Sequence, residues 1–279
     1  RDQPRSRGLG DVYKRQAEWI EQVSSELHYN DKNLIEKVIR ALSLLEMLVK
    51  AGCPLVFKGG TALMLILGKS AHRLSIDIDL ICPPGTNIED YLKSFADFGF
   101  INLELVERKQ RDDADIPKSH SKFFYQIAYR NDTDAQSYIL LDVLYEDIHY
   151  FRTQQIAINC PFIRLEGKPL MVTVPSAEDI LGDKLTAFAP NTTGIPYYKN
   201  GRSYSMEIAK QLYDVGRLFE NVSDLQITKE AFRKIAVVEL SYRSFGTDIG
   251  QVFNDIRQTA LCISTRGKAG EGDFDLIQD

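Results

Sequence analysis

The residues best suited to chemistry are two aspartates, Asp77 and Asp79, in the segment "RLSIDIDLIC" (residues 73–82). In an extended strand, residues i and i+2 project from the same face, so these two carboxylates are expected to lie side by side. Apolar residues alternate with them, which predicts a largely buried strand where two bare like charges are costly. A Mg²⁺ ion removes this cost, because it binds a few carboxylate oxygens together with substrate phosphates.

A Gly-Gly-Thr turn precedes the aspartates, in "KGGTAL" (residues 58–63). Gly59 and Gly60 allow backbone N–H groups to approach a phosphate, and the helix expected to follow offers its positive N-terminal end. Thr61 would add a hydroxyl, and Arg73 and Ser75 would contact a phosphate beside the aspartates. Together the turn and the carboxylates predict a metal-dependent nucleotide site. The alternative is a tight turn followed by a solvated Asp pair on an edge strand.

A third acid, Asp142, lies within the apolar segment "ILLDVLY" (residues 139–145). Two-metal sites that act on phosphates commonly use a third carboxylate beside a neighbouring pair, so we expect Asp142 to bind Mg²⁺ together with Asp77 and Asp79. Without this context, Asp142 would be a strand-end residue with a local hydrogen bond.

These motifs resemble a known family. A Gly-Gly-Thr turn, a short helix and then Arg-x-Ser-x-Asp-x-Asp are similar to the first motif of the nucleotidyltransferase superfamily. The form "KGGTAL…HRLSIDIDL" resembles in particular the AbiEii/AbiGii-type toxins of abortive-infection and type IV toxin–antitoxin systems. The resemblance extends from about Val56 to Leu218 and is strongest at residues 57–80 and 176–215.

The resemblance also supplies roles for residues in the second half of the chain. In "SAEDILGDKLTAF", Lys184 matches the lysine that reaches the active site of the family; alone, it would be taken for a solvated helix residue. In "KQLYDVGRL", Asp214 takes the second acid position of the next motif, whereas Gln211 replaces the first acid. Catalytic roles for Asp77, Asp79, Asp142, Lys184 and Asp214 follow from the resemblance.

The function that the resemblance implies is transfer of NMP from an NTP to RNA, with tRNA as the expected acceptor. It also implies a toxin used in phage defence, paired with a separate antitoxin protein encoded nearby. One alternative keeps the enzyme but gives it a small-molecule acceptor such as an antibiotic. Another is an inactive nucleotide-binding protein, for which Gln211 is the support.

Hydrophobic periodicity defines the elements that must position these residues. A helix is expected over residues 31–50, a short strand at "PLVFKGG" (54–60) and a brief helix at "TALMLILG" (61–68). A helix is expected at "NIEDYLKSFADFG" (87–99), and strands at 101–108, 122–129 and 137–147. After Pro175 the pattern is helical, broken by the tyrosine-rich segment 190–205, which is either a solvated connector or a surface for bases and phosphates.

The predicted fold class is α+β, with a nucleotidyltransferase-like mixed-sheet catalytic half and a helical C-terminal half. We expect a catalytic domain over residues 17–174 and a helical domain over 175–279 that contributes to the site. Residues 1–16 resemble a translated adapter sequence and are expected to be non-native.

The chain of 279 residues has a net charge of −5, so it has no overall attraction to nucleic acid or membranes. Its four cysteines are scattered, as is usual in a reducing cytoplasm, and no segment is apolar over the roughly 18 residues that a membrane span needs. We therefore expect a cytoplasmic protein with no membrane contact.

Overall fold

The structure is a computed structural model that describes residues 9–68, 71, 73–106, 117–128, 135–164, 167–243, 246 and 248–278. The chain divides into two compact units. Unit 1 comprises residues 1–108, 118–146 and 155–173, and unit 2 comprises residues 109–117, 147–154 and 174–279. Among the described residues, no helix has the length and apolar character needed to cross a membrane.

The described part of unit 1 contains a mixed sheet of five strands in the order β1-β2-β5-β4-β3. Strand β2 is parallel to β5, and the other neighbouring pairs are antiparallel. The strands are β1 (Val56–Lys58), β2 (Ile78–Cys82), β3 (Asn102–Val106), β4 (Lys118–Gln126) and β5 (Gln136–Tyr145). The predicted strand over residues 73–82 is therefore only half right, because regular pairing begins at Ile78.

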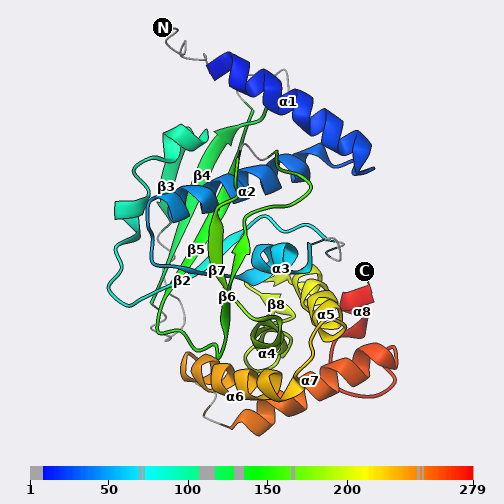
Figure 1. The fold of residues 1–279 in the computed structure, drawn as a ribbon. Helices are drawn as coiled ribbons and strands as arrows, with labels where there is room; N and C mark the ends of the chain where they lie inside the picture. Colours follow the sequence, from blue (N-terminus) through cyan, green and yellow to red (C-terminus); the bar gives the residue numbers. More distant parts are fainter. Residues whose placement is uncertain are drawn as a thin grey trace, which may run out of the picture. The chain divides into compact units, whose positions relative to one another are not determined.

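Helix α2 (Lys32–Lys50) contacts β2 and β5 and lies along one face of the sheet (Figure 1). Asp31 caps this helix by accepting a hydrogen bond of 3.0 Å from the Leu34 N–H. Helix α1 (Leu9–Glu26) packs on α2, and α3 (Gly59–Leu67) follows β1 directly. Residues 9–16, expected to be adapter-derived, thus lie in α1, and residues 1–8 lie outside the described part.

The predicted helix over residues 87–99 is wrong. Two short 3-10 helices, η2 (Ile88–Tyr91) and η3 (Phe95–Phe98), stand in its place. Neither the Asn87 nor the Ser94 side chain makes a capping hydrogen bond. Because helix nucleation is costly, a segment this short without a cap does not hold a continuous α-helix.

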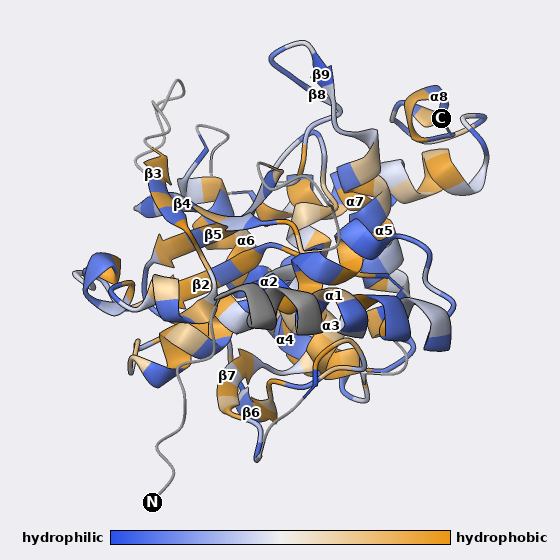
Figure 2. Cartoon of the chain, turned by 90° about the horizontal axis from the view of Figure 1, so that it is seen from above, coloured by the Kyte–Doolittle hydropathy of each residue, from blue (hydrophilic) through white to orange (hydrophobic). Residues whose placement is uncertain are grey.

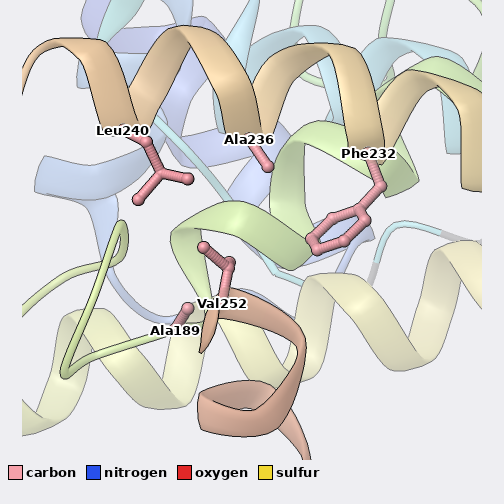
Figure 3. Close-up of a cluster of buried hydrophobic side chains, with 5 residues drawn as sticks. All are labelled: Ala189, Phe232, Ala236, Leu240 and Val252. Carbon is pink, nitrogen blue, oxygen red and sulfur yellow. The ribbon is translucent and has the colours of Figure 1, made fainter. Parts of the chain in front are cut away.

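Unit 2 is built around α4 (Ala177–Ala187), which contacts α5 (Ser205–Phe219), α6 (Leu225–Ser241) and α7 (Ile249–Ser264) (Figure 1). The Ser176 hydroxyl caps α4 by accepting a hydrogen bond from the Asp179 N–H. Buried side chains of α6 and α7 form a small core with Ala189 (Figure 3). The other elements of this unit are β8 (Tyr198–Lys199), β9 (Arg202–Ser203) and α8 (Phe274–Gln278). A two-stranded sheet of β6 (Thr153–Ala157) and β7 (Met171–Pro175) has most of its residues in unit 1.

A mixed sheet with helices packed on it, and a largely helical second unit, confirm the predicted α+β class. The predicted domains, residues 17–174 and 175–279, stay predictions.

Candidate active site

The two glycines of the Gly-Gly-Thr turn make room for three polar side chains at the start of α3. Gly59 has φ +77°, and a Cβ atom added there would lie 2.0 Å from Oδ2 of Asp79. A Cβ atom on Gly60 would lie 2.6 Å from Oγ of Ser75 and 3.0 Å from a guanidinium nitrogen of Arg73. Asp79, Ser75 and Arg73 therefore pack directly on the two glycines, where a larger residue would displace them.

The sheet brings Asp79 together with Asp142. These residues are paired in the parallel β2–β5 ladder, and Lys58 of β1 is paired with Asp79 on the other side. Paired residues of adjacent strands project from the same face, so the two carboxylates are neighbours with a lysine in the same row. Like charges at such positions repel each other, and a cation between them relieves the repulsion.

His120 completes this row and was not singled out from the sequence. It is paired with Asp142 in the β4–β5 ladder, and its Nδ1 donates a hydrogen bond to Oδ1 of Asp142. The imidazole is 7% exposed, and its buried Nε2 has no hydrogen-bond partner among the described residues. The hydrogen bond fixes one carboxylate oxygen of Asp142 and leaves the other for a ligand.

Thr61 and Asp77 are placed differently from expectation. Thr61 is fully buried, and its hydroxyl donates a hydrogen bond of 2.7 Å to the backbone carbonyl oxygen of Asp77. In this arrangement the hydroxyl holds the chain before β2, and the phosphate contact expected of Thr61 stays a prediction. Asp77 precedes the strand and is exposed, so it does not share a buried strand with Asp79.

Lys184 and Asp214 form an ion pair within unit 2. The Lys184 Nζ lies 3.0 Å from Oδ2 of Asp214, and the side chains are 11% and 2% exposed. Gln211 accepts a second hydrogen bond of 3.0 Å from the same ammonium through its amide oxygen. An amide oxygen accepts a hydrogen bond as a carboxylate oxygen does. Gln211, at the position where the motif has an acid, therefore keeps Lys184 oriented but carries no negative charge.

The predicted site residues thus fall into two groups, each held within its own unit. Unit 1 carries the glycines, Asp79 and Asp142, and unit 2 carries Lys184 and Asp214. Within the described residues, no group of three or more His, Cys, Asp or Glu side chains is arranged to hold a metal ion. The paired carboxylates of unit 1 fit Mg²⁺ nevertheless, because this ion is commonly bound by one or two carboxylates plus substrate phosphates.

The comparison with protein families gives one match, the nucleotidyl transferase AbiEii toxin of type IV toxin–antitoxin systems, over residues 41–272. The chain therefore belongs to the AbiEii family of nucleotidyltransferase toxins. It is a nucleotidyltransferase, and its family implies a nucleotide substrate and an antitoxin partner. No curated protein matches the chain.

Solved structures similar to the chain include JHP933 from Helicobacter pylori, with 18% identity and a TM-score of 0.41 over 86% of this chain and 92% of that one. They also include MenT4, the nucleotidyltransferase toxin Rv2826c from Mycobacterium tuberculosis H37Rv. MenT4 shares 16% identity with a TM-score of 0.40, over 95% of this chain and 75% of the other.

Proposed function

We propose that this nucleotidyltransferase transfers NMP from an NTP to an RNA acceptor, with tRNA as the acceptor to test first, and that it requires Mg²⁺. The observation that carries the proposal is the Asp79–Asp142 pair, which lies in one row of the sheet beside the Gly59–Gly60 turn. A carboxylate pair next to a helix N-terminus matches the needs of a metal-bound triphosphate.

In the reaction, an acceptor hydroxyl oxygen forms a bond to the α-phosphorus, the bond to pyrophosphate breaks, and the hydroxyl proton is released. Bound Mg²⁺ would neutralise phosphate charge and align the attacking and leaving oxygens. Asp79 and Asp142 would hold it, with Asp77 as a further carboxylate at the exposed entrance to β2. The backbone N–H groups of the Gly59–Gly60 turn would bind phosphate oxygens, assisted by Arg73 and Ser75.

Lys184 would donate to phosphate oxygens as negative charge moves to the leaving pyrophosphate. Asp214 and Gln211 fix the direction of its ammonium group before the nucleotide binds. A cation oriented in advance by buried partners needs no reorganisation during the reaction, which favours the charged transition state.

The test supplies the purified protein with Mg²⁺, total bacterial RNA and each NTP labelled in turn at the α-phosphate. Label is expected in a tRNA-sized band, lost without Mg²⁺ and lost in Asp77→Asn. Asp77 is a suitable target because its side chain is exposed and the carbonyl oxygen that Thr61 holds is unchanged. An unchanged melting temperature would show that the variant is folded. Absence of label in RNA with every NTP would contradict the RNA acceptor.

The proposed biological role is a cytoplasmic toxin for phage defence that a separate, nearby-encoded antitoxin counteracts. Induced expression in a bacterial host should arrest growth, and Asp77→Asn should relieve the arrest. Growth arrest by the variant equal to that of the parent would contradict a toxic effect through nucleotidyl transfer.

A further inference from the structure

The tyrosine-rich connection between α4 and α5 contains a tight hairpin. Strands β8 and β9 are joined by Asn200 and Gly201, whose φ angles of +53° and +74° are those of a type I′ turn. This turn matches the twist of the flanking strands and makes a two-residue connection rigid. Figure 2 shows the hairpin extending away from α5 and α7 of the same unit.

The base of the hairpin is anchored, whereas its tip is exposed. The Tyr204 N–H donates a 3.0 Å hydrogen bond to the Tyr197 carbonyl oxygen. The Tyr197 hydroxyl packs so closely on Gly272 that a Cβ atom there would lie 2.6 Å from it. Tyr198, one residue further on, is 57% exposed. Its aromatic ring is thus held on a fixed element and directed to solvent.

Two cations stand opposite each other on this hairpin. Lys199 is paired with Arg202 in the β8–β9 ladder, so both side chains project from the same face. Both are exposed, and within the described part of the chain neither has a carboxylate within ion-pair distance. Like charges directly opposite each other destabilise a hairpin. The stability of the fold therefore does not explain this pair, whereas binding of an anion between the two cations does.

We propose that the β8–β9 hairpin binds single-stranded RNA that passes around its edge, with a backbone phosphate between Lys199 and Arg202 on one face and a base stacked on Tyr198 on the other. The guanidinium of Arg202 lies 5.8 Å from the Tyr204 ring centre, which restrains a group that binds phosphate oxygens through two parallel N–H donors. Exposed aromatic rings beside cations are the recurring means of holding single strands without sequence preference. The inference rests on the proposed function, because it gives the RNA acceptor a contact surface.

The test measures binding and needs no NTP. Fluorescence anisotropy of a short fluorescein-labelled single-stranded RNA is recorded at several salt concentrations for the full chain. The double variant Lys199→Gln/Arg202→Gln should lower the magnitude of the log–log salt slope by about 0.7, since it removes one phosphate contact on a single strand. The control Lys229→Gln/Arg233→Gln removes two exposed cations of α6, with the same change in net charge, and should keep the parent slope.

Tyr198→Ala separates stacking from charge. It should weaken RNA binding about fivefold or more while leaving the salt slope unchanged, because a stacked base releases no counterion. Melting temperatures should not fall in the double variant, whose substitutions relieve repulsion. The single variant Lys199→Gln provides a second test should the double variant unfold, with a smaller loss in slope because Arg202 still contacts the phosphate.

Parent-like slope and affinity in all hairpin variants would overturn the inference, and label transfer to RNA by the same variants would leave the proposed function intact. RNA bound through the hairpin but never labelled would support the inference and contradict the proposed transferase reaction with RNA.

Discussion

Gly59 and Asp79 are in close contact at the start of α3. A substitution of Gly59 therefore has two effects, strain of the backbone and displacement of the Asp79 side chain. Gly59→Ala meets a positive φ angle and also places a Cβ atom 2.0 Å from the Asp79 carboxylate. Asp79 must then leave its present position beside Asp142. We expect Gly59→Ala to abolish nucleotidyl transfer, measured with labelled NTP, and to destabilise the fold by more than the roughly 1–2 kcal/mol cost of left-handed backbone alone.

Gly52 supplies the matched control for this substitution. Its φ angle is +75°, almost the same as that of Gly59, but no atom lies within 4 Å of an added Cβ. Gly52→Ala should therefore cost about 1–2 kcal/mol in chemical denaturation and keep its transfer activity. Equal loss of activity in both variants would show that backbone strain, and not displacement of Asp79, is responsible.

His120 is expected to act through Asp142 by holding its carboxylate in place for the metal. Outer partners of metal ligands typically change affinity or activity about 10–100-fold when they are removed. His120→Ala should therefore lower both the transfer rate and the affinity for Mn²⁺, used as a spectroscopic substitute for Mg²⁺. His120→Asn should restore a large part of both, because the Asn amide places an N–H donor near the position of Nδ1.

The size-matched variant His120→Leu provides the control for packing, since it fills the buried space without a donor. Asn and Leu variants that bind Mn²⁺ equally well would contradict a positioning role and leave His120 as a core residue.

At the scale of elements, the signals that could be predicted from the sequence are local ones. The cap of Asp31 on α2 and that of Ser176 on α4 depend on residues three positions apart, and both are present. The alternation in β4 and β5 likewise identifies strands from the chain itself. The Asn-Gly turn of the β8–β9 hairpin is also a local signal, although the segment was predicted only as a loop.

Features that depend on pairing between distant segments could not be predicted in this way. Asp142 meets His120 only because of the β4–β5 register, which no periodicity specifies. Residues 73–77 alternate like a strand, but the structure places the side chains of Arg73 and Ser75 against Gly60, and regular pairing starts only at Ile78. The candidate site was therefore predictable as a set of residues, whereas its supporting contacts were not.

Helix α2 contains a buried acid with a predictable effect of pH. Both carboxylate oxygens of Glu36 accept from the Ala128 N–H, at 3.0 and 3.2 Å, and Arg40 lies 3.6 Å away. Burial raises the pKa of Glu36 above its usual 4.5, and the Ala128 N–H and Arg40 only partly oppose this. Because the folded state holds the proton more tightly, the contribution of Glu36 to stability is full below pH 4.5 and is lost as pH rises through the raised pKa.

The measurement is the free energy of unfolding of the parent minus that of Glu36→Gln, taken by urea titration at a series of pH values. The difference should fall as pH rises from 4.5, since glutamine does not titrate. A difference that grows with pH would mean that the Arg40 charge dominates over burial.

At the scale of the whole molecule, the residues with proposed roles are distributed over both units. Asp79 and Asp142 belong to unit 1, and Lys184 with its partner Asp214 belongs to unit 2. A ligand that binds only the folded state stabilises it by about 2.7 kcal/mol at a hundredfold excess over its Kd. The increase in the free energy of unfolding that a nucleotide causes therefore reports which residues bind the nucleotide.

Trp19 makes this measurable, because it is the single tryptophan of the chain and lies in α1 of unit 1. Its Nε1 donates a 2.9 Å hydrogen bond to the Phe162 carbonyl oxygen, so unfolding of unit 1 changes its surroundings and its fluorescence. With Mg²⁺ and a non-hydrolysable NTP analogue, the urea midpoint of this signal should rise in the parent and not in Asp79→Asn. If Lys184 binds the same triphosphate, Lys184→Met should reduce the rise, whereas Lys229→Met, an exposed lysine of unit 2, should not. A full rise in Lys184→Met would restrict nucleotide binding to unit 1 and leave the Lys184–Asp214 pair a structural role, because the triphosphate would then be held without it.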